Sequence, residues 1–123
     1  EFNLILNNQV ALYKSTGQPF TLISLKLDPQ AEAAGIISMS QLSNAVRLSL
    51  TLKEKICVDG YTVLVLLAKG DEKALPVLAA KLRANLQSND PGFINRVFPL
   101  IYSHSYVSNA TTENADGILR EIL

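Results

Sequence analysis

Hydrophobic and polar positions change their period several times along the chain, and each period predicts an element. Apolar side chains recur every three or four positions through residues 2–16, which is typical of an amphipathic helix that ends at Gly17 and Pro19. Residues 20–28 alternate instead, as in a strand, and Pro29 ends it. One face of this strand carries Phe20, Leu22, Ser24 and Lys26, and the other carries Thr21, Ile23, Leu25 and Leu27.

Residues 53–69 hold the strongest pattern, two β-rich runs joined at Asp59-Gly60. These two residue types tolerate the positive φ that a type I′ turn requires at both central positions, so the pattern predicts a hairpin with its tip at this dipeptide. The second arm, residues 61–68, is nearly all apolar. A strand of this kind is covered on both faces, so we expect it at the centre of a sheet.

Two helices flank this hairpin in the sequence. After a short connection over residues 29–37, which we expect to hold one irregular turn, Ser38 and Gln41 form a capping-box pattern that opens a helix reaching about Thr51. Gly70-Asp71 opens the other, because Asp is a good N-cap, and the helix extends to about Gln87. Its apolar stripe consists of Ala74, Leu75, Leu78, Leu82 and Leu86.

The last third of the chain predicts a loop, a strand and a helix. Residues 88–92 read SNDPG, a turn composition. Residues 93–107 are rich in β-branched and aromatic side chains, which predicts a fourth strand over 97–107. Thr112 is then expected to cap a helix with an apolar stripe of Ala115, Ile118, Leu119 and Ile122.

The interior order of these elements is βαββαβ, which predicts an α+β fold of the ferredoxin-like palm type, with extra helices at the N- and C-terminal ends. We expect the two interior helices on one face of the sheet and an extra helix across the other. A chain of 123 residues with 48% hydrophobic content can bury one ordinary core, so it forms a single domain.

Composition excludes several classes of partner. Eleven basic and eleven acidic residues cancel, which argues against binding to nucleic acid or to a membrane surface. The sequence holds no membrane-spanning run and no signal peptide, so we expect a cytoplasmic protein or the cytoplasmic part of a membrane-associated one. The chain starts at Glu1 and stops inside a helical pattern, so we expect residues 1–123 to be one domain of a longer multidomain protein.

Five stretches, in this order and spacing, carry a resemblance to a known family. They are GQPFTLISLKLD, KICVDGYTVLVLL, ALPVLAAKLRANL, IYSHSYV and TTENADGILREIL. Over nearly its whole length the chain resembles GGDEF domains, the diguanylate cyclase domains of bacteria. The resemblance implies the nucleotide-cyclase-like palm, with the Gly-Gly-Asp-Glu-Phe signature at the hairpin and an Asp-x-Asp at the end of the first strand.

The signature itself has changed. Cys57 and Val58 stand where the family has two glycines, which there let the backbone approach the GTP phosphates, and a β-branched valine crowds that approach. Asp59 keeps the first signature acid, which the resemblance implicates in metal binding. Gly60 replaces the second acid, and Tyr61 replaces the phenylalanine conservatively.

The metal-binding Asp-x-Asp has changed too. Lys26 stands in place of the first aspartate, and Asp28 keeps only the second. Phosphoryl transfer to a cyclic dinucleotide depends on cations that bridge phosphate oxygens, and a protonated lysine cannot ligate them. The resemblance therefore implies a degenerate GGDEF domain that is not an enzyme, with no catalytic residues, no metal site and no cofactor.

Recognition elements are missing as well. The connection over residues 29–40 lacks the Phe-Lys, Asn-Asp and Gly-His elements that the family has there. At the positions of the family's product-binding Arg-x-x-Asp the chain has Leu48 and Thr51. We therefore expect no product-binding motif.

A few residues still allow ligand binding to be considered. Lys26, Asp28 and Asp59 are weak candidates for a vestigial nucleotide site. The alternative for Lys26 is a solvated side chain at a strand end. For Asp28 it is a helix or turn cap, and for Asp59 it is the preference of Asp for tight turns. His104, the only histidine, has no catalytic partner nearby in the sequence. Tyr102 and Tyr106 share its strand face and offer either a contact surface or packing against a helix.

Two functions remain in view. The first is an inactive signalling or scaffolding module of a cyclic di-GMP-related regulatory protein, which acts through a protein partner or a homodimer. The alternative is a sensor that binds a guanine nucleotide or cyclic di-GMP without turnover. An active cyclase is disfavoured by the missing carboxylates, and an unrelated RNA-binding domain of the same fold by the neutral charge.

Overall fold

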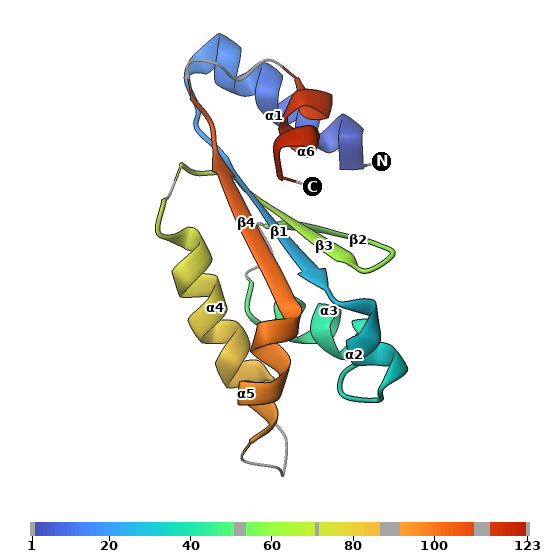
Figure 1. Ribbon diagram of the computed structural model, residues 1–123. Helices are drawn as coiled ribbons and strands as arrows, with labels where there is room; N and C mark the ends of the chain where they lie inside the picture. Colours follow the sequence, from blue (N-terminus) through green and yellow to red (C-terminus); the bar gives the residue numbers. More distant parts are fainter. Residues whose placement is uncertain (1, 51–53, 71, 87–91, 110–113, 123) are drawn as a thin grey trace.

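The computed structural model describes residues 2–50, 54–70, 72–86, 92–109 and 114–122, and its centre is a four-stranded antiparallel sheet (Figure 1). The strands are β1 (Thr21–Leu27), β2 (Lys55–Asp59), β3 (Thr62–Leu67) and β4 (Ile101–Val107), in the spatial order β2-β3-β1-β4. This order is that of the predicted palm, so the fold class is confirmed. The two inner strands are also the two most apolar, because both of their faces are covered.

The helices lie on both faces of the sheet. They are α1 (Phe2–Thr16), α2 (Pro29–Ala33), α3 (Met39–Leu48), α4 (Ala74–Asn85), α5 (Phe93–Val97) and α6 (Ala115–Ile122), with a short 3₁₀ turn η1 (Phe98–Leu100). Helices α2 to α5 cover one face, and the terminal helices α1 and α6 lie together on the other (Figure 1). The expectation of an extra helix across the open face is confirmed, and two helices share that role.

The alternation of β1 divides the core into two clusters, as the sequence predicted. Ile23, Leu25 and Leu27 point toward helices α2 to α5, where they join buried side chains from every helix on that side. Phe20 and Leu22 point toward α1 and α6. The remaining buried members of this second cluster are Leu6, Val10, Leu64, Leu66, Tyr106, Ala115 and Ile118.

The hairpin turns one residue later than predicted. Asp59 pairs with Thr62, so the two residues at the tip are Gly60 and Tyr61. Gly60 has φ of 58°, and no described residue other than glycine has a positive φ. A positive φ at the first central position alone is the pattern of a type II′ turn, so the predicted type I′ turn at Asp59-Gly60 is wrong.

Residues 93–100 are helical, which contradicts the strand predicted from residue 97. Phe93 and Val97 are four residues apart and both buried, so one helical turn places both side chains in the core. Pro99 lies in η1, where its missing N–H costs no strand pairing. The fourth strand therefore begins at Ile101.

Helix starts follow local capping chemistry. At α3 the predicted capping box is confirmed, because the Gln41 N–H donates to Ser38 Oγ (3.1 Å) and the Ser38 N–H donates to Gln41 Oε1 (2.9 Å). Helix α4 begins at Ala74, later than predicted, and Lys73 makes no side-chain cap. The predicted features at Thr51, Asp71, Gln87 and Thr112 lie outside the described residues. At α6 the Gly117 N–H donates to Asn114 Oδ1 (2.8 Å).

None of the helices in the described part of the chain combines the length and the apolar character needed to span a membrane.

Candidate functional site

The three residues predicted for a nucleotide site all lie at one end of the sheet. The strand register aligns Asp59 with Thr62, Thr62 with Lys26, and Lys26 with Tyr102. We call these four residues the polar row. Because the residues opposite one another in a sheet point to the same face, their side chains share the face that α1 and α6 cover elsewhere. Neighbouring strands are about 4.8 Å apart, which places Lys26 and Asp59 roughly 10 Å apart along the row.

Asp28 follows the end of β1, where its carboxylate caps helix α2. Asp28 has extended φ and ψ of −60° and 123°, its Oδ1 accepts from the Gln30 N–H at 3.0 Å, and Pro29 occupies the first helical position. The Tyr102 hydroxyl donates to Oδ2 at 3.4 Å. Both oxygens therefore have structural partners, which is the helix-cap alternative considered from the sequence.

The hairpin tip offers little cover for a ligand. Asp59 is exposed at the last position of β2, and Val58 and Tyr61 are 40% and 41% exposed. Cys57 is half-buried and packs against the cluster beneath α1 and α6. The Tyr61 carbonyl accepts from the Leu27 N–H at 2.8 Å, which ties the turn to the end of β1.

The donor set at this end does not fit a catalytic divalent cation. Mg²⁺ prefers carboxylate oxygens in near-octahedral geometry, whereas Lys26 presents an ammonium group and Asp28 uses its carboxylate as a helix cap. Within the described ranges, no three His, Cys, Asp or Glu side chains gather where they could hold a metal ion.

The last strand carries one exposed and one buried tyrosine. Tyr102 is 52% exposed and His104 is exposed, whereas Tyr106 is only 7% exposed. The Tyr106 ring lies 6.4 Å from the Phe20 ring, in the core beneath α1 and α6. Of the two predicted alternatives for these tyrosines, Tyr102 therefore fits a surface and Tyr106 fits packing.

Two hollows on the opposite side of the molecule were not predicted from the sequence. One, of about 70 Å³, lies between the end of α3 and the start of α4. It is lined by Ser49, Leu50, Glu54, Leu67, Lys69, Ala74, Val77, Leu78 and Lys81. The other, of about 230 Å³, is lined by Gln41, Asn44, Ala45, Leu48, Asn85, Leu86 and Phe93. Each hollow is lined by segments that lie far apart in the sequence, so no local sequence pattern predicts either one.

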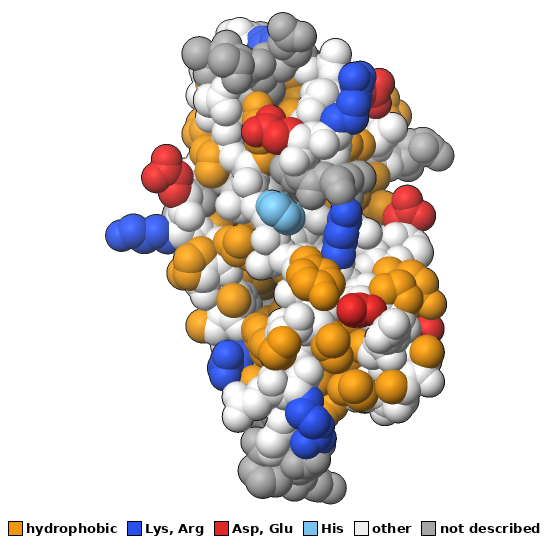
Figure 2. Space-filling view, viewed as in Figure 1, with side chains coloured by type: hydrophobic (Ala, Val, Ile, Leu, Met, Phe, Trp, Pro, Cys, Tyr) orange, Lys and Arg blue, Asp and Glu red, His pale blue; other side chains and the backbone are white. Residues whose placement is uncertain are grey.

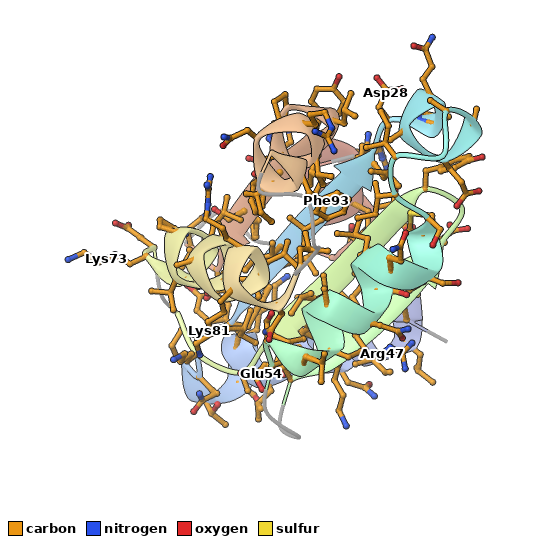
Figure 3. The ribbon with its side chains drawn as sticks, turned by 90° about the horizontal axis from the view of Figure 1, so that it is seen from below. Asp28, Arg47, Glu54, Lys73, Lys81 and Phe93 are labelled. Carbon is orange, nitrogen blue, oxygen red and sulfur yellow. The ribbon has the colours of Figure 1, made fainter. Side chains whose placement is uncertain are left out.

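Neither hollow includes a residue of the polar row. Figure 3 places Asp28 at the start of α2, well away from Glu54 and Lys81 of the smaller hollow. On the face seen in Figure 2, basic and acidic side chains are scattered, and neither kind gathers into a patch.

Comparison with known proteins identifies the fold. No protein-family model matches the sequence, and no curated protein matches it. Among solved structures, the GGDEF domain of PA1120 (YfiN or TpbB) from Pseudomonas aeruginosa is similar, with a TM-score of 0.68 and 14% identity over 98% of this chain and 81% of that one. The active GGEEF domain of a diguanylate cyclase from Vibrio cholerae has a TM-score of 0.62 and 15% identity, over 98% and 79%.

A third similar structure is that of a larger protein. Diguanylate cyclase SiaD from P. aeruginosa, in complex with its activator SiaC, has a TM-score of 0.62 and 13% identity over 98% of this chain and 49% of that one. This chain thus spans about half of SiaD. It has the fold of GGDEF domains, which is the fold of diguanylate cyclases, and identities this low establish the fold alone.

Proposed function

We propose that this chain is a catalytically inactive GGDEF-like domain that serves as a signalling or scaffolding module in a bacterial regulatory protein related to cyclic di-GMP. It acts through contacts with a protein partner or a second copy. Its place is the cytoplasm, alone or as the cytoplasmic part of a membrane-associated protein, and the flanking domains of a longer chain carry the output.

One observation carries the proposal. At the position of the family's metal-binding aspartate the chain has Lys26, and the remaining acid, Asp28, uses Oδ1 to cap α2. A cation that bridged triphosphate oxygens would have to displace this cap and tolerate an ammonium group two residues away. Protein contact does not depend on metal chemistry, and the SiaD cyclase supports this role, because its structure contains an activator protein.

Turnover of GTP tests the proposal directly. The purified chain is incubated with GTP and either Mg²⁺ or Mn²⁺, and cyclic di-GMP is measured by chromatography. The active GGEEF domain from Vibrio cholerae serves as the positive control. We expect no product above the buffer blank, and product formation that depends on both the chain and the metal would overturn the inactive assignment.

The polar row favours a second candidate, a sensor that binds a nucleotide without turnover. One side of the sheet end carries a cation and two hydroxyl groups, from Lys26, Thr62 and the half-exposed Tyr102. Such groups can donate hydrogen bonds to phosphate oxygens. A sensor would show a higher melting temperature with GTP or cyclic di-GMP, because a ligand of the native state stabilises it. Lys26→Gln should then abolish the shift, and Lys55→Gln, on the same face at the other end of β2, should keep it.

A further inference from the structure

Strand β4 forms one edge of the sheet, and the direction of its hydrogen bonds is fixed. The Asp28 N–H donates to the Leu100 carbonyl (2.8 Å), and the Ser108 N–H donates to the Phe20 carbonyl (3.0 Å). Hydrogen-bonded pairs alternate in an antiparallel ladder, so the even-numbered residues of β4 face β1. The N–H and C=O groups of the odd-numbered residues, including Ser103 and Ser105, therefore point toward the open edge.

Within the residues that the structure describes, this edge lacks the usual protection against pairing. Natural edge strands carry charges, proline or bulges that prevent a further strand from adding. The opposite edge strand, β2, begins at Lys55 and ends at Asp59, both exposed. In contrast, β4 reads IYSHSYV, without a charged residue or a proline. Its three middle residues, 103–105, are exposed on both faces of the sheet, so no described helix covers this part of the edge.

The sequence of β4 is symmetric about His104. Serines lie at 103 and 105, tyrosines at 102 and 106, and Ile101 and Val107 at the two ends. A strand of this kind is complementary to an antiparallel copy of itself, as a twofold interface requires. With His104 opposite His104, all seven residues find a partner of the same type.

We propose that β4 pairs antiparallel with β4 of a second copy, which joins two four-stranded sheets into one continuous sheet around a twofold axis at His104. In this register Ser103 of one copy lies opposite Ser105 of the other and exchanges hydrogen bonds through the outward backbone groups. Tyr102 lies opposite Tyr106, and aromatic and hydroxyl pairs of this kind stabilise antiparallel strands. The partner in the proposed function is then a second copy of this chain, and the biological role of the dimer rests on that proposed function.

The first test is sedimentation equilibrium of the purified chain from micromolar to millimolar concentration. We expect a reversible dimer. Ser105→Pro removes an outward N–H but no bond to β1, so it should raise the dissociation constant roughly tenfold or more, because hydrogen bonds are lost symmetrically in both copies. Ser105→Ala, which keeps the N–H, should leave the dissociation constant within about twofold. Circular dichroism checks that each variant is folded.

The second test uses the twofold axis and does not depend on the proline variant. His104→Lys and His104→Glu each place like charges opposite one another, and each should be monomeric where the parent chain is dimeric. Mixing the two variants should restore association, because residue 104 of one copy then faces the opposite charge. Association that survives in each separate charge variant would overturn the proposal, and so would a parent chain that stays monomeric at every concentration. GTP turnover is a separate readout, so failure here is distinguishable from failure of the inactive assignment.

Discussion

The two faces of the sheet are stabilised to different extents. Among the described residues, 17 buried side chains form the cluster beneath helices α2 to α5, and nine form the cluster beneath α1 and α6. The larger cluster extends along the whole of β1, through Ile23, Leu25 and Leu27. The smaller one involves β1 only at Phe20 and Leu22. Beyond these residues, the α1/α6 face turns polar at Ser24 and Lys26.

This difference separates stability from recognition within one small domain. The α2–α5 face supplies most of the apolar burial, which is the main favourable contribution to folding. The uncovered end of the other face holds the polar row, and the open edge at β4 borders it. We therefore expect substitutions at that end to cost little stability.

Truncation of one leucine on each face should cause the largest loss in the free energy of unfolding. Leu25 and Leu22 lie on the same strand and are 3% and 0% exposed. Leu→Ala costs about 2–5 kcal/mol, depending on how far the surroundings collapse into the cavity. We expect Leu25→Ala near the upper end, because several helices hold its site open, and Leu22→Ala near the lower end, because α1 and α6 can move inward. Urea denaturation measures both, and an equal or reversed order would contradict the comparison.

Two buried serines should respond with opposite signs. Ser49 Oγ donates to the Ala45 carbonyl (2.7 Å) and accepts from Asn85 Nδ2 (2.9 Å), so Ser49→Ala should lower the free energy of unfolding by about 1–2 kcal/mol. Ser24 Oγ, on the α1/α6 face, is buried without a hydrogen-bond partner in the described structure. Ser24→Ala removes that unsatisfied group and should raise the free energy of unfolding by about 1 kcal/mol. Thermal denaturation of both variants distinguishes the signs, and a destabilised Ser24→Ala would indicate a bridging water.

Periodicity was sufficient to predict the order of the strands and of the longer helices, the two faces of β1 and the inner position of the apolar strand β3, because long apolar patterns reflect which side chains are buried. It failed at residues 93–100. Phe93 and Val97 are β-favouring types, yet their spacing of four places both in the core from a single helical turn, and tertiary packing overrides weak local preference. The turn position shifted by one residue because Asp59 pairs with Thr62.

The candidate site could be located from the sequence only in part. The strand order brings Lys26, Asp28 and Asp59 to one end of the sheet, as the resemblance implied. The roles of their side chains depend on local geometry, which the sequence does not show. Asp28 caps helix α2, although the sequence predicted only an irregular turn there. The hollows between α3 and α4 could not be predicted, because their walls come from segments that meet only after the helices pack.

The smallest effect on stability is expected at Asp28. If its carboxylate caps a helix, the variants should behave differently than if it binds a cation. Asn is as good an N-cap as Asp, so Asp28→Asn should change the melting temperature little, whereas Asp28→Ala should cost about 1 kcal/mol. If the carboxylate instead bound Mg²⁺, the parent chain would melt higher in millimolar Mg²⁺ and Asp28→Asn would lose that increase. We expect no dependence on Mg²⁺ in the parent chain or either variant. Ser38→Ala, which removes the cap of α3, is the matched control for loss of a cap without loss of a charge.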